Sequence, residues 1–220
     1  LPASLNHLSV VFSANAMRLA GVHVESETRD RTIKVWDTES GAELLAVPLL
    51  RSHSSSTISL ALHPDGNRLA VTTLAQDGSL ELKMYDITTR AAIFSIRERS
   101  NPDQTNDFLT RDRKLWISDD GMRLAMTVNG GEDNGTKQSA VGFWDAGTGE
   151  KLATVPLPGP WPSNVTISPD GSRIALTNPS VVTEGAADAV AITILDVAAT
   201  ANPEASTENP VTIPLAGPAS

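Results

Sequence analysis

Four stretches of the chain carry nearly the same sequence, and their spacing constrains the fold more than any other feature. Each is a turn followed by arginine, an aliphatic residue and alanine. They are residues 12–20 (FSANAMRLA), 62–70 (LHPDGNRLA), 117–125 (ISDDGMRLA) and 167–175 (ISPDGSRIA). The alanines that end them lie 50, 55 and 50 residues apart. A period of this size is typical of an array of like supersecondary units.

Every unit has a second landmark, a bulky residue followed by aspartate. These pairs are Trp36-Asp37, Tyr85-Asp86, Trp144-Asp145 and Leu195-Asp196. Residues 80–85 (LELKMY) alternate apolar and charged side chains, which is the period of a β-strand. Short apolar runs such as residues 58–62 are also rich in β-formers. We expect each unit to be a four-stranded antiparallel sheet.

The turn that opens each unit has a recognisable chemistry. Pro64-Asp65-Gly66 and Pro169-Asp170-Gly171 combine a preset φ, an Asx-type hydrogen bond and a residue that accepts a positive φ. The first unit has Asn15-Ala16 instead. Alanine adopts a positive φ at a steric cost that glycine avoids, so we expect a weaker turn in the first unit.

Sheets that are apolar on both faces must be covered by neighbours, and radial stacking of such sheets gives a β-propeller. The sequence therefore predicts an all-β fold with four blades, at about residues 5–50, 56–98, 107–157 and 163–215. Propellers have about four to eight blades, so we interpret the chain as an arc of a larger propeller. An open arc would expose two apolar blade faces and invite self-association.

These landmarks resemble the WD-repeat β-propeller family, and the fourth unit also resembles YVTN-type propeller repeats. The turn motif is shared with TolB-like propellers. The WD-repeat family has a Gly-His pair before the first strand, and here Ser52-His53 alone fits, with serine in place of glycine. We do not expect the family's full histidine hydrogen-bond network. The resemblance implies a rigid platform for a protein or peptide partner, without catalysis of its own, although fold does not determine function.

The amino-acid composition limits the classes of partner that we expect. There are 17 Lys and Arg against 26 Asp and Glu, which gives a net charge of −9. This charge disfavours nucleic acid and anionic membranes as partners. No apolar stretch approaches the ~18 residues of a membrane span, so no membrane insertion is expected. The absence of cysteine favours the cytoplasm and does not exclude a secreted chain.

Motifs for catalysis or cofactor binding are absent from the sequence. The histidines His7, His23, His53 and His63 have no metal-motif spacing, and no G-x-S-x-G nucleophile elbow occurs. Gly130-Gly131 is not followed by the Gly-Lys-Ser/Thr of a phosphate-binding loop. We expect no enzyme activity, no cofactor and no metal.

Loop length indicates where a partner would bind. The loops between second and third strands and the links between blades are long and variable, as in residues 25–31, 97–113, 128–138 and 178–188. Rigid scaffolds place recognition on such loops, so we expect the binding surface on this side.

Particular residues of these loops are the candidates. Trp161 would be an exposed aromatic anchor or, equally, a plug between blades. The arginines would grip an acidic peptide through bidentate pairs, and the alternative is that they pair within the protein. They are Arg29, Arg31, Arg97, Arg99, Arg111 and Arg113.

The arginines repeated after the opening turns, Arg18, Arg68, Arg123 and Arg173, invite a different interpretation. Repeat identity reports architecture, so we expect each guanidinium to reach an aspartate or carbonyl nearby rather than a ligand.

Two further functions stay open at this point. The chain would serve as an accessory or gating propeller beside a hydrolase or kinase domain, or as a YVTN-type ligand-binding propeller outside the cytoplasm. Catalytic motifs in a longer parent chain would favour the first, and stabilisation by calcium would favour the second.

Overall fold

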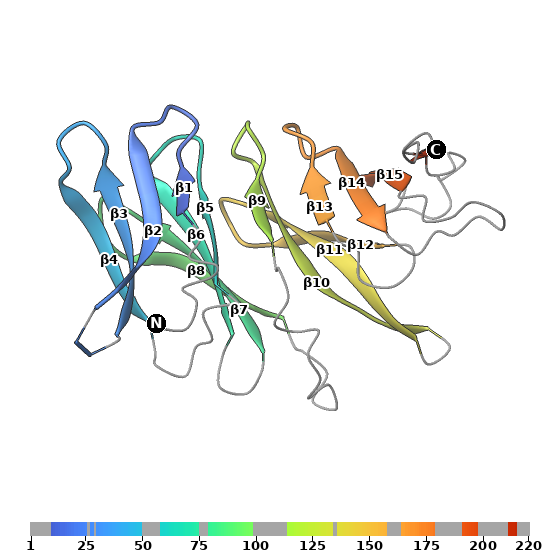
Figure 1. Ribbon diagram of the computed structural model, residues 1–220, viewed down its shortest axis with the longest axis horizontal. Helices are drawn as coiled ribbons and strands as arrows, with labels where there is room; N and C mark the ends of the chain where they lie inside the picture. The colour runs from blue at the N-terminus through green and yellow to red at the C-terminus, as the bar shows by residue number, and fades with distance from the viewer. Residues whose placement is uncertain are drawn as a thin grey trace, which may run out of the picture. The chain divides into compact units, whose positions relative to one another are not determined.

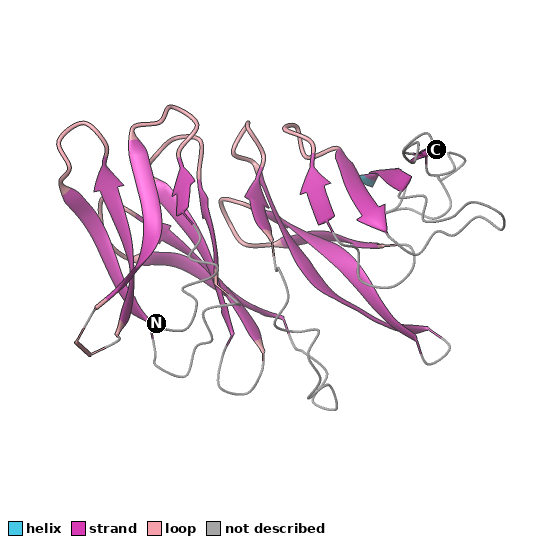
Figure 2. Ribbon diagram, viewed as in Figure 1, coloured by secondary structure: helices cyan, strands magenta, loops and turns pink. Residues whose placement is uncertain are grey.

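The computed structural model describes residues 10–25, 27–28, 30–49, 58–74, 79–98, 114–133, 136–157, 164–178, 191–197 and 211–214. Within these residues it consists of four four-stranded antiparallel sheets (Figures 1 and 2). The expected β-propeller blades are therefore confirmed. We call the sheets blades 1 to 4 in chain order.

The strands of each blade follow one another in space as they do in the sequence. Blade 1 contains β1 (Val10–Phe12), β2 (Arg18–Val24), β3 (Arg31–Asp37) and β4 (Glu43–Leu49). Blade 2 contains β5 (Ser59–Leu62), β6 (Arg68–Leu74), β7 (Leu80–Asp86) and β8 (Ala92–Glu98). Blade 3 contains β9 (Leu115–Ile117), β10 (Arg123–Asp133), β11 (Thr136–Asp145) and β12 (Lys151–Pro156). Blade 4 contains β13 (Asn164–Ile167), β14 (Arg173–Asn178), β15 (Ala191–Asp196) and β16 (Val211–Pro214).

The chain divides into two compact units. The first comprises Leu1–Ile117 with Ala146–Gly149, and the second comprises Ser118–Asp145 with Glu150–Ser220. Blades 1 and 2 lie in the first unit and blade 4 lies in the second.

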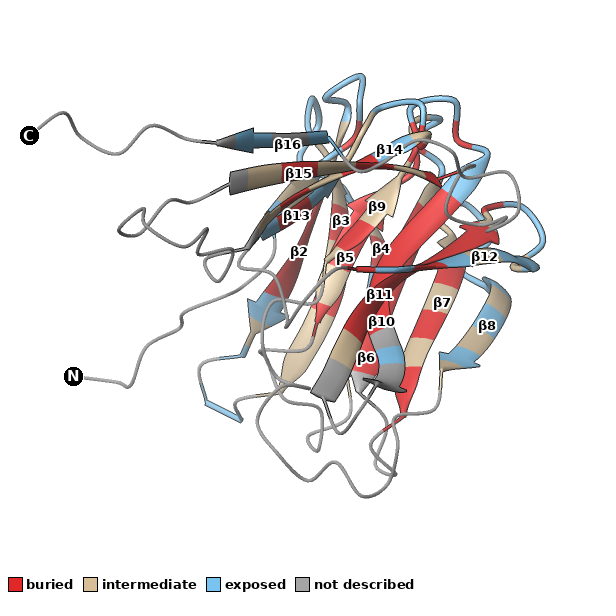
Figure 3. Ribbon diagram, turned by 90° about the vertical axis from the view of Figure 1, so that its right-hand side faces the viewer, coloured by how far each residue is buried: buried red, intermediate tan, exposed pale blue. Residues whose placement is uncertain are grey.

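Alternation along the strands builds the core of the first unit. In β3, Ile33 and Val35 are fully buried while their neighbours are only half-buried, as expected of a strand whose side chains alternate between two faces. One apolar cluster joins side chains of both blades. It contains Ala20, Val22, Ile33, Val35 and Leu45 of blade 1 with Ile58, Leu60, Leu62, Leu69, Val71 and Ile87 of blade 2. Figure 3 shows the buried positions alternating with half-buried ones along the ribbons of these blades.

Blade 3 corrects one prediction. Residues 128–138 are expected to be a long loop, yet β10 continues to Asp133 and β11 begins at Thr136. These two residues face each other in register, and the ladder has an irregularity between Asn129 and Gly131. The reason is local, because Asn-Gly, which stands at 134 and 135, is the strongest two-residue signal for a β-hairpin.

The unusual turn of blade 1 forms as the sequence predicts. Ala16 has a φ of 56°, and the glycines at the same repeat position, Gly66, Gly121 and Gly171, have φ values of 72°, 72° and 67°. All four turns therefore use the same left-handed backbone, and only blade 1 makes it with a residue that carries a Cβ.

Candidate interaction surfaces at the two ends of the blades

Each blade has two unlike ends. At one end lie the short turns between its first and second strands and between its third and fourth strands, and we call this the turn end. At the other end lie the connections between second and third strands and the links between blades, and we call this the loop end. In blade 1 the turn end holds residues 13–17 and 38–42, and the loop end holds Val24 and Arg31 (Figure 1).

Serine side chains organise the opening turns. The backbone N–H of Arg18 donates to Ser13 Oγ at 3.0 Å, and the equivalent bonds from Arg123 to Ser118 and from Arg173 to Ser168 are both 2.9 Å. Each serine hydroxyl in turn donates to the amide or carboxylate oxygen two residues later. These distances are 2.7 Å to Asn15, 2.5 Å to Asp120 and 2.6 Å to Asp170.

Blade 2 makes the same turn with a histidine. His63 is buried, its backbone N–H donates to the carbonyl of Arg68 at 2.9 Å, and its Nδ1 lies 3.0 Å from an Asp65 carboxylate oxygen. The Arg68 guanidinium completes this group, with 2.8 Å between Nη2 and Asp65 Oδ2. His63 is therefore part of the turn, in the place that serine holds in the other blades.

The aspartates of these turns have lowered pKa values. Hydrogen bonds from the Ser168 hydroxyl, then from the backbone and hydroxyl of Ser172, lower the pKa of Asp170 to about 2. The Ser118 hydroxyl and the backbone of Met122 lower the pKa of Asp120. For Asp65, burial alone would raise the pKa, but the Asn67 N–H and the Arg68 and His63 charges outweigh it and lower the pKa.

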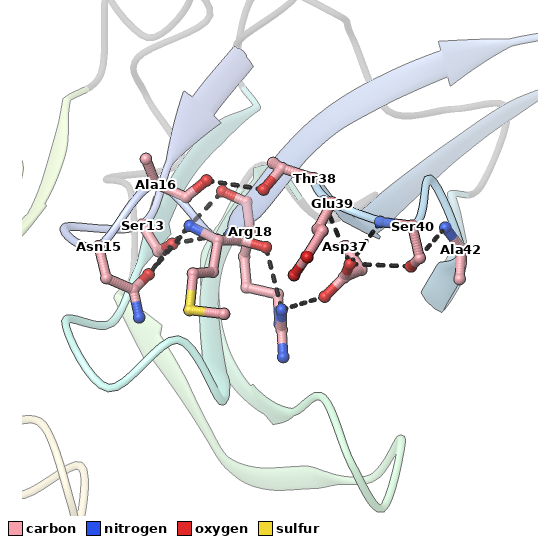
Figure 4. Close-up of polar contacts among 10 residues, drawn as sticks. Ser13, Asn15, Ala16, Arg18, Asp37, Thr38, Glu39, Ser40 and Ala42 are labelled. Atoms are coloured by element: carbon pink, nitrogen blue, oxygen red, sulfur yellow. Dashed lines mark hydrogen bonds and ion pairs between the residues drawn. The ribbon is translucent and has the colours of Figure 1, made fainter.

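In blades 1 and 2 the aspartate of the Trp-Asp or Tyr-Asp landmark closes the second turn. Asp37 Oδ1 accepts from the N–H and the hydroxyl of Ser40 at 2.9 and 2.8 Å, and Asp86 Oδ1 accepts from the Thr89 N–H at 2.7 Å (Figure 4 shows the blade 1 contacts). These backbone hydrogen bonds are the largest cause of the lowered pKa of both carboxyls. Asp37 and Asp86 are therefore turn-forming groups.

Three of the four repeated arginines bind within the protein through their side chains. Arg18 forms an ion pair with Asp37, which lies directly opposite it in the β2–β3 ladder, and Nη1 also donates to the Met17 carbonyl at 3.0 Å (Figure 4). Arg68 pairs with Asp65, and Arg123 Nη1 donates to the Gly171 carbonyl at 3.3 Å. These contacts match the structural role that repeat identity predicts.

Two of these arginines also lie beside the opening turn of the next blade. A Cβ built on Gly66 would lie 3.7 Å from Arg18 Cγ, and one built on Gly171 would lie 3.2 Å from Arg123 Cδ. In the second unit the Asp119 N–H also donates to the Pro169 carbonyl at 2.7 Å. Within each compact unit, contacts at the turn end therefore join one blade to the next.

At the loop end of blade 2, the predicted binding residue Arg97 belongs to a charged group whose other charged members, Glu81 and Lys83, were not predicted as site residues. Glu81 Oε2 lies 3.0 Å from Lys83 Nζ, and Glu81 Oε1 lies 3.2 Å from the Ser95 hydroxyl and 3.6 Å from Arg97 Nε. Burial alone would raise the pKa of Glu81, but the Lys83 hydrogen bond and charge, with Ser95 and Arg97, lower it. The alternation in residues 80–85 could have shown that Glu81 and Lys83 lie on one face of the strand. It could not have shown that Arg97 lies opposite Glu81, because that depends on the β7–β8 register.

The structure places two of the predicted binding residues. Arg97 lies on β8 and its side chain is 61% exposed, while Arg31 is the first residue of β3 and is half-buried. They belong to different blades. Trp161, Arg29, Arg99, Arg111 and Arg113 lie outside the described residues, so their roles stay predictions.

Two absences concern the described residues alone. No group of three or more His, Cys, Asp or Glu side chains there is arranged to hold a metal ion. None of the helices in the described part is long and apolar enough to cross a membrane.

Comparison with known sequences supports the repeat assignment. Residues 44–82 match the model of the WD domain, G-beta repeat. The chain is 29% identical over 140 residues to coronin-7 of Mus musculus, covering 64% of this chain, and 34% identical over 113 residues to coronin-7 of Bos taurus, covering 51%. The chain spans only 13% and 11% of the length of these relatives.

Solved structures show the same fold at low sequence identity. Hydrazine synthase of Kuenenia stuttgartiensis aligns with 91% of this chain at a TM-score of 0.56 and 17% identity. The β-propeller domain of the trilobed protease of Pyrococcus furiosus aligns with 86% at a TM-score of 0.55 and 14% identity. The alignments cover 50% and 55% of those chains. The repeats, the four-stranded blades, the matched repeat model and the likeness to coronin-7 together support a WD-repeat β-propeller family for this chain.

Proposed function

We propose that this chain is a non-catalytic scaffold that binds a protein or peptide partner at the loop end of its blades. WD-repeat propellers are suited to this role because a rigid set of sheets holds variable loops in fixed positions. The observation that carries the proposal is the exposed, oriented Arg97. Arg97 Nε lies 3.6 Å from Glu81 Oε1, and this ion pair favours a guanidinium position at the loop end before a partner arrives.

A positioned guanidinium favours an acidic peptide. Arginine binds carboxylates through two parallel hydrogen bonds, and a side chain already held in place loses less conformational entropy on binding. Because the chain itself has a net charge of −9, binding to an acidic segment would depend on this local charge.

The test uses peptides selected against the chain from a display library. Arg97→Ala should weaken the selected peptides by about tenfold, and the loss should shrink at high salt. The matched control is Arg90→Asn, which removes one positive charge from the turn end of the same β7–β8 hairpin and keeps a residue that tolerates the φ of 60° found there. Equal binding by both variants would refute the loop-end assignment.

Trp161→Ala sharpens the test. If Trp161 is an exposed anchor, this variant should weaken the same peptides while the melting temperature barely changes. A large fall in melting temperature would instead show that Trp161 is part of the core between blades.

A second candidate function is that of an accessory propeller in a larger enzyme. It is favoured by the solved structures with this fold, which include the propeller domain of a protease and, at a TM-score of 0.57, the acylaminoacyl peptidase of Pyrococcus horikoshii. The discriminating observation is the sequence that flanks these residues in the gene. A nucleophile elbow or kinase motifs there would favour the accessory role.

A further inference from the structure

The fourth strand of blade 2 differs from the fourth strands of the other blades at one position. In blades 1, 3 and 4 this strand carries a proline at the same place in the repeat, and in blade 2 an arginine stands there. The residues are Pro48, Arg97, Pro156 and Pro214. They lie opposite equivalent residues of the third strands, which are Thr32, Glu81, Ala140 and Ala191. The four positions therefore share one register, and only the residue type differs.

The prolines show which way the backbone points at this position. A proline has no N–H, so it fits an antiparallel ladder only where the backbone groups face away from the neighbouring strand. In blade 3 the next residue faces inward, since the Leu157 N–H donates to the Ser139 carbonyl at 2.8 Å. At the same register in blade 2, the Arg97 N–H and C=O point to the outer edge of β8. Those of Ser95, two residues earlier, point the same way.

That outer edge of β8 lacks the protection that the other blades have. Within the described residues β8 pairs with β7 alone, and Figure 3 shows β8 at the border of its sheet with exposed positions along it. Proline on an edge strand hinders the addition of another strand, because it removes a backbone donor. In β8 Arg97 keeps its N–H, Ser95 is exposed, and Ile93 is 45% exposed.

The charge on this edge selects the kind of strand that could be added. A cation on an edge strand opposes pairing with an apolar or cationic strand, and it favours a strand with a carboxylate opposite it. The Arg97 side chain is 61% exposed, whereas that of Glu81 is only 13% exposed. The Glu81 carboxylate also contacts Lys83 Nζ at 3.0 Å and the Ser95 hydroxyl at 3.2 Å. Glu81 therefore keeps partners when Arg97 turns toward an incoming carboxylate.

We propose that the outer edge of β8 is a strand-addition site for an extended acidic segment of a partner protein. The segment would pair with the outward N–H and C=O groups of Ser95 and Arg97, and one of its carboxylates would face the Arg97 guanidinium. In this mode of recognition the main-chain hydrogen bonds supply affinity and alternate side chains supply specificity. The inference rests on the proposed function and adds to it the way in which the peptide is held.

Two variants of Arg97 separate backbone recognition from side-chain recognition. The probe is the tightest peptide from a display library of linear peptides, and its dissociation constant is measured by isothermal titration calorimetry. Arg97→Ala removes the guanidinium and keeps the N–H, so it should weaken the peptide by about tenfold. Arg97→Pro removes both and should weaken the peptide by about another tenfold. The fold should tolerate this proline because the other blades have one there, and thermal unfolding checks that it does.

The same pair of variants distinguishes failure of this inference from failure of the proposed function. Equal losses of affinity in Arg97→Ala and Arg97→Pro would overturn strand addition and leave the loop-end proposal intact. Unchanged affinity in both variants would refute the two proposals together.

A second experiment leaves the protein unaltered. Single N-methyl groups are placed on successive backbone nitrogens of the peptide. Alternate N–H groups of an added strand face β8, so every second N-methyl group should weaken binding by about tenfold. Amide hydrogen exchange of Ser95 and Arg97 should slow when the peptide binds, with the inward-facing Ile96 N–H as the reference.

Two results of the second experiment would overturn the proposal. One is an N-methyl series without alternation and without slower exchange at Ser95. The other is slower exchange at Ser95 that grows with the concentration of the chain in the absence of peptide, because a second copy of the chain would then occupy the edge.

Discussion

The turn ends and the loop ends of the blades are built from the same strands, but their chemistry differs. At the turn ends the same bonds recur from blade to blade, as in the serine hydroxyl that accepts from the arginine N–H in blades 1, 3 and 4. At the loop end of blade 2 the contacts are a local arrangement of Glu81, Lys83 and Arg97 that the repeat does not impose. Repetition at the turn ends reflects architecture, and variation at the loop ends leaves those side chains available for specificity.

The difference between the two ends predicts different consequences of mutation. Substitutions at the turn ends should change the free energy of unfolding and leave partner binding nearly unchanged. Substitutions at the loop ends should do the reverse. The following experiments test this contrast in order of decreasing expected effect.

Gly149→Ala should be the most damaging change at a turn end. Gly149 has a φ of 77°, and a Cβ there would lie 2.7 Å from the Phe94 ring. Strained backbone and a clash with a ring together should cost about 2 to 3 kcal/mol in the free energy of unfolding, measured by urea denaturation. Gly41→Ala is the matched control, since Gly41 has a φ of 71° but nothing within 4 Å of its built Cβ. It should cost only about 1 kcal/mol, and equal losses would show that the ring contact is unimportant.

Asp65→Ala should be the next most damaging. The Asp65 carboxylate accepts from the Asn67 N–H at 2.8 Å and pairs with Arg68, and it also lies beside the buried His63. Losing these contacts should cost about 1 to 2 kcal/mol, since the carboxylate is partly exposed and solvent screens its charge. Glu81→Gln at the loop end is the comparison, and we expect a smaller loss there. A larger loss of unfolding free energy for Glu81→Gln than for Asp65→Ala would contradict the proposed difference between the two ends.

Acid should weaken the turn ends. The pKa of Asp170 is lowered to about 2 from 3.8, so its ionised form stabilises the fold above pH 3.8, and this contribution is lost as the pH falls toward 2. Asp170→Asn should therefore flatten the dependence of the melting temperature on pH over this range. Asp119→Asn, in the opening turn of blade 3, is a control for removal of an exposed carboxylate from a turn end. Unchanged pH dependence in Asp170→Asn would contradict the assigned hydrogen bonds.

Ala16→Gly should stabilise the first turn slightly. Glycine relieves the strain of a φ of 56° but makes the unfolded chain more flexible, so the net gain should be about 0.5 kcal/mol. Arg90→Gly, at a φ of 60° in the β7–β8 turn, should act in the same direction. Thermal unfolding of both variants and of the double variant checks this, and the gains should add because the two turns are separate. Destabilisation by Ala16→Gly would show that its methyl group is needed for packing.

Arg97→Ala should have the smallest effect on stability of these substitutions. The side chain is largely exposed, and its contact with Glu81 is 3.6 Å, so the loss should be below about 0.5 kcal/mol. The same variant should produce the largest fall in binding of the selected peptides. A stability loss as large as that of Asp65→Ala would mean that contacts at the loop end stabilise the fold as much as contacts at the turn end do.

Most of the fold follows from the sequence because its signals are local. The spacing of Ala20, Ala70, Ala125 and Ala175 predicts four units, and the turn residues predict the left-handed backbone at Ala16 and its glycine equivalents. The prediction for residues 128–138 was wrong because its polar composition outweighed the Asn-Gly hairpin signal within it. The pairing of Glu81 with Arg97 was not predicted, because it depends on the register of the β7–β8 hairpin, which is irregular between Met84 and Tyr85.

The sequence by itself determined the number of units, the strand pattern within each and the turn chemistry, since all of these depend on residues close together along the chain. Only the tertiary structure decided how deeply the side chains at equivalent positions of the repeat are buried. Ile33 and Val35 are buried because blade 2 covers them, while Ile192 and Ile194, which stand at the same positions, stay half-exposed. Burial is a property of neighbours, and a repeat that is nearly uniform in sequence carries no record of which of its faces a neighbour covers.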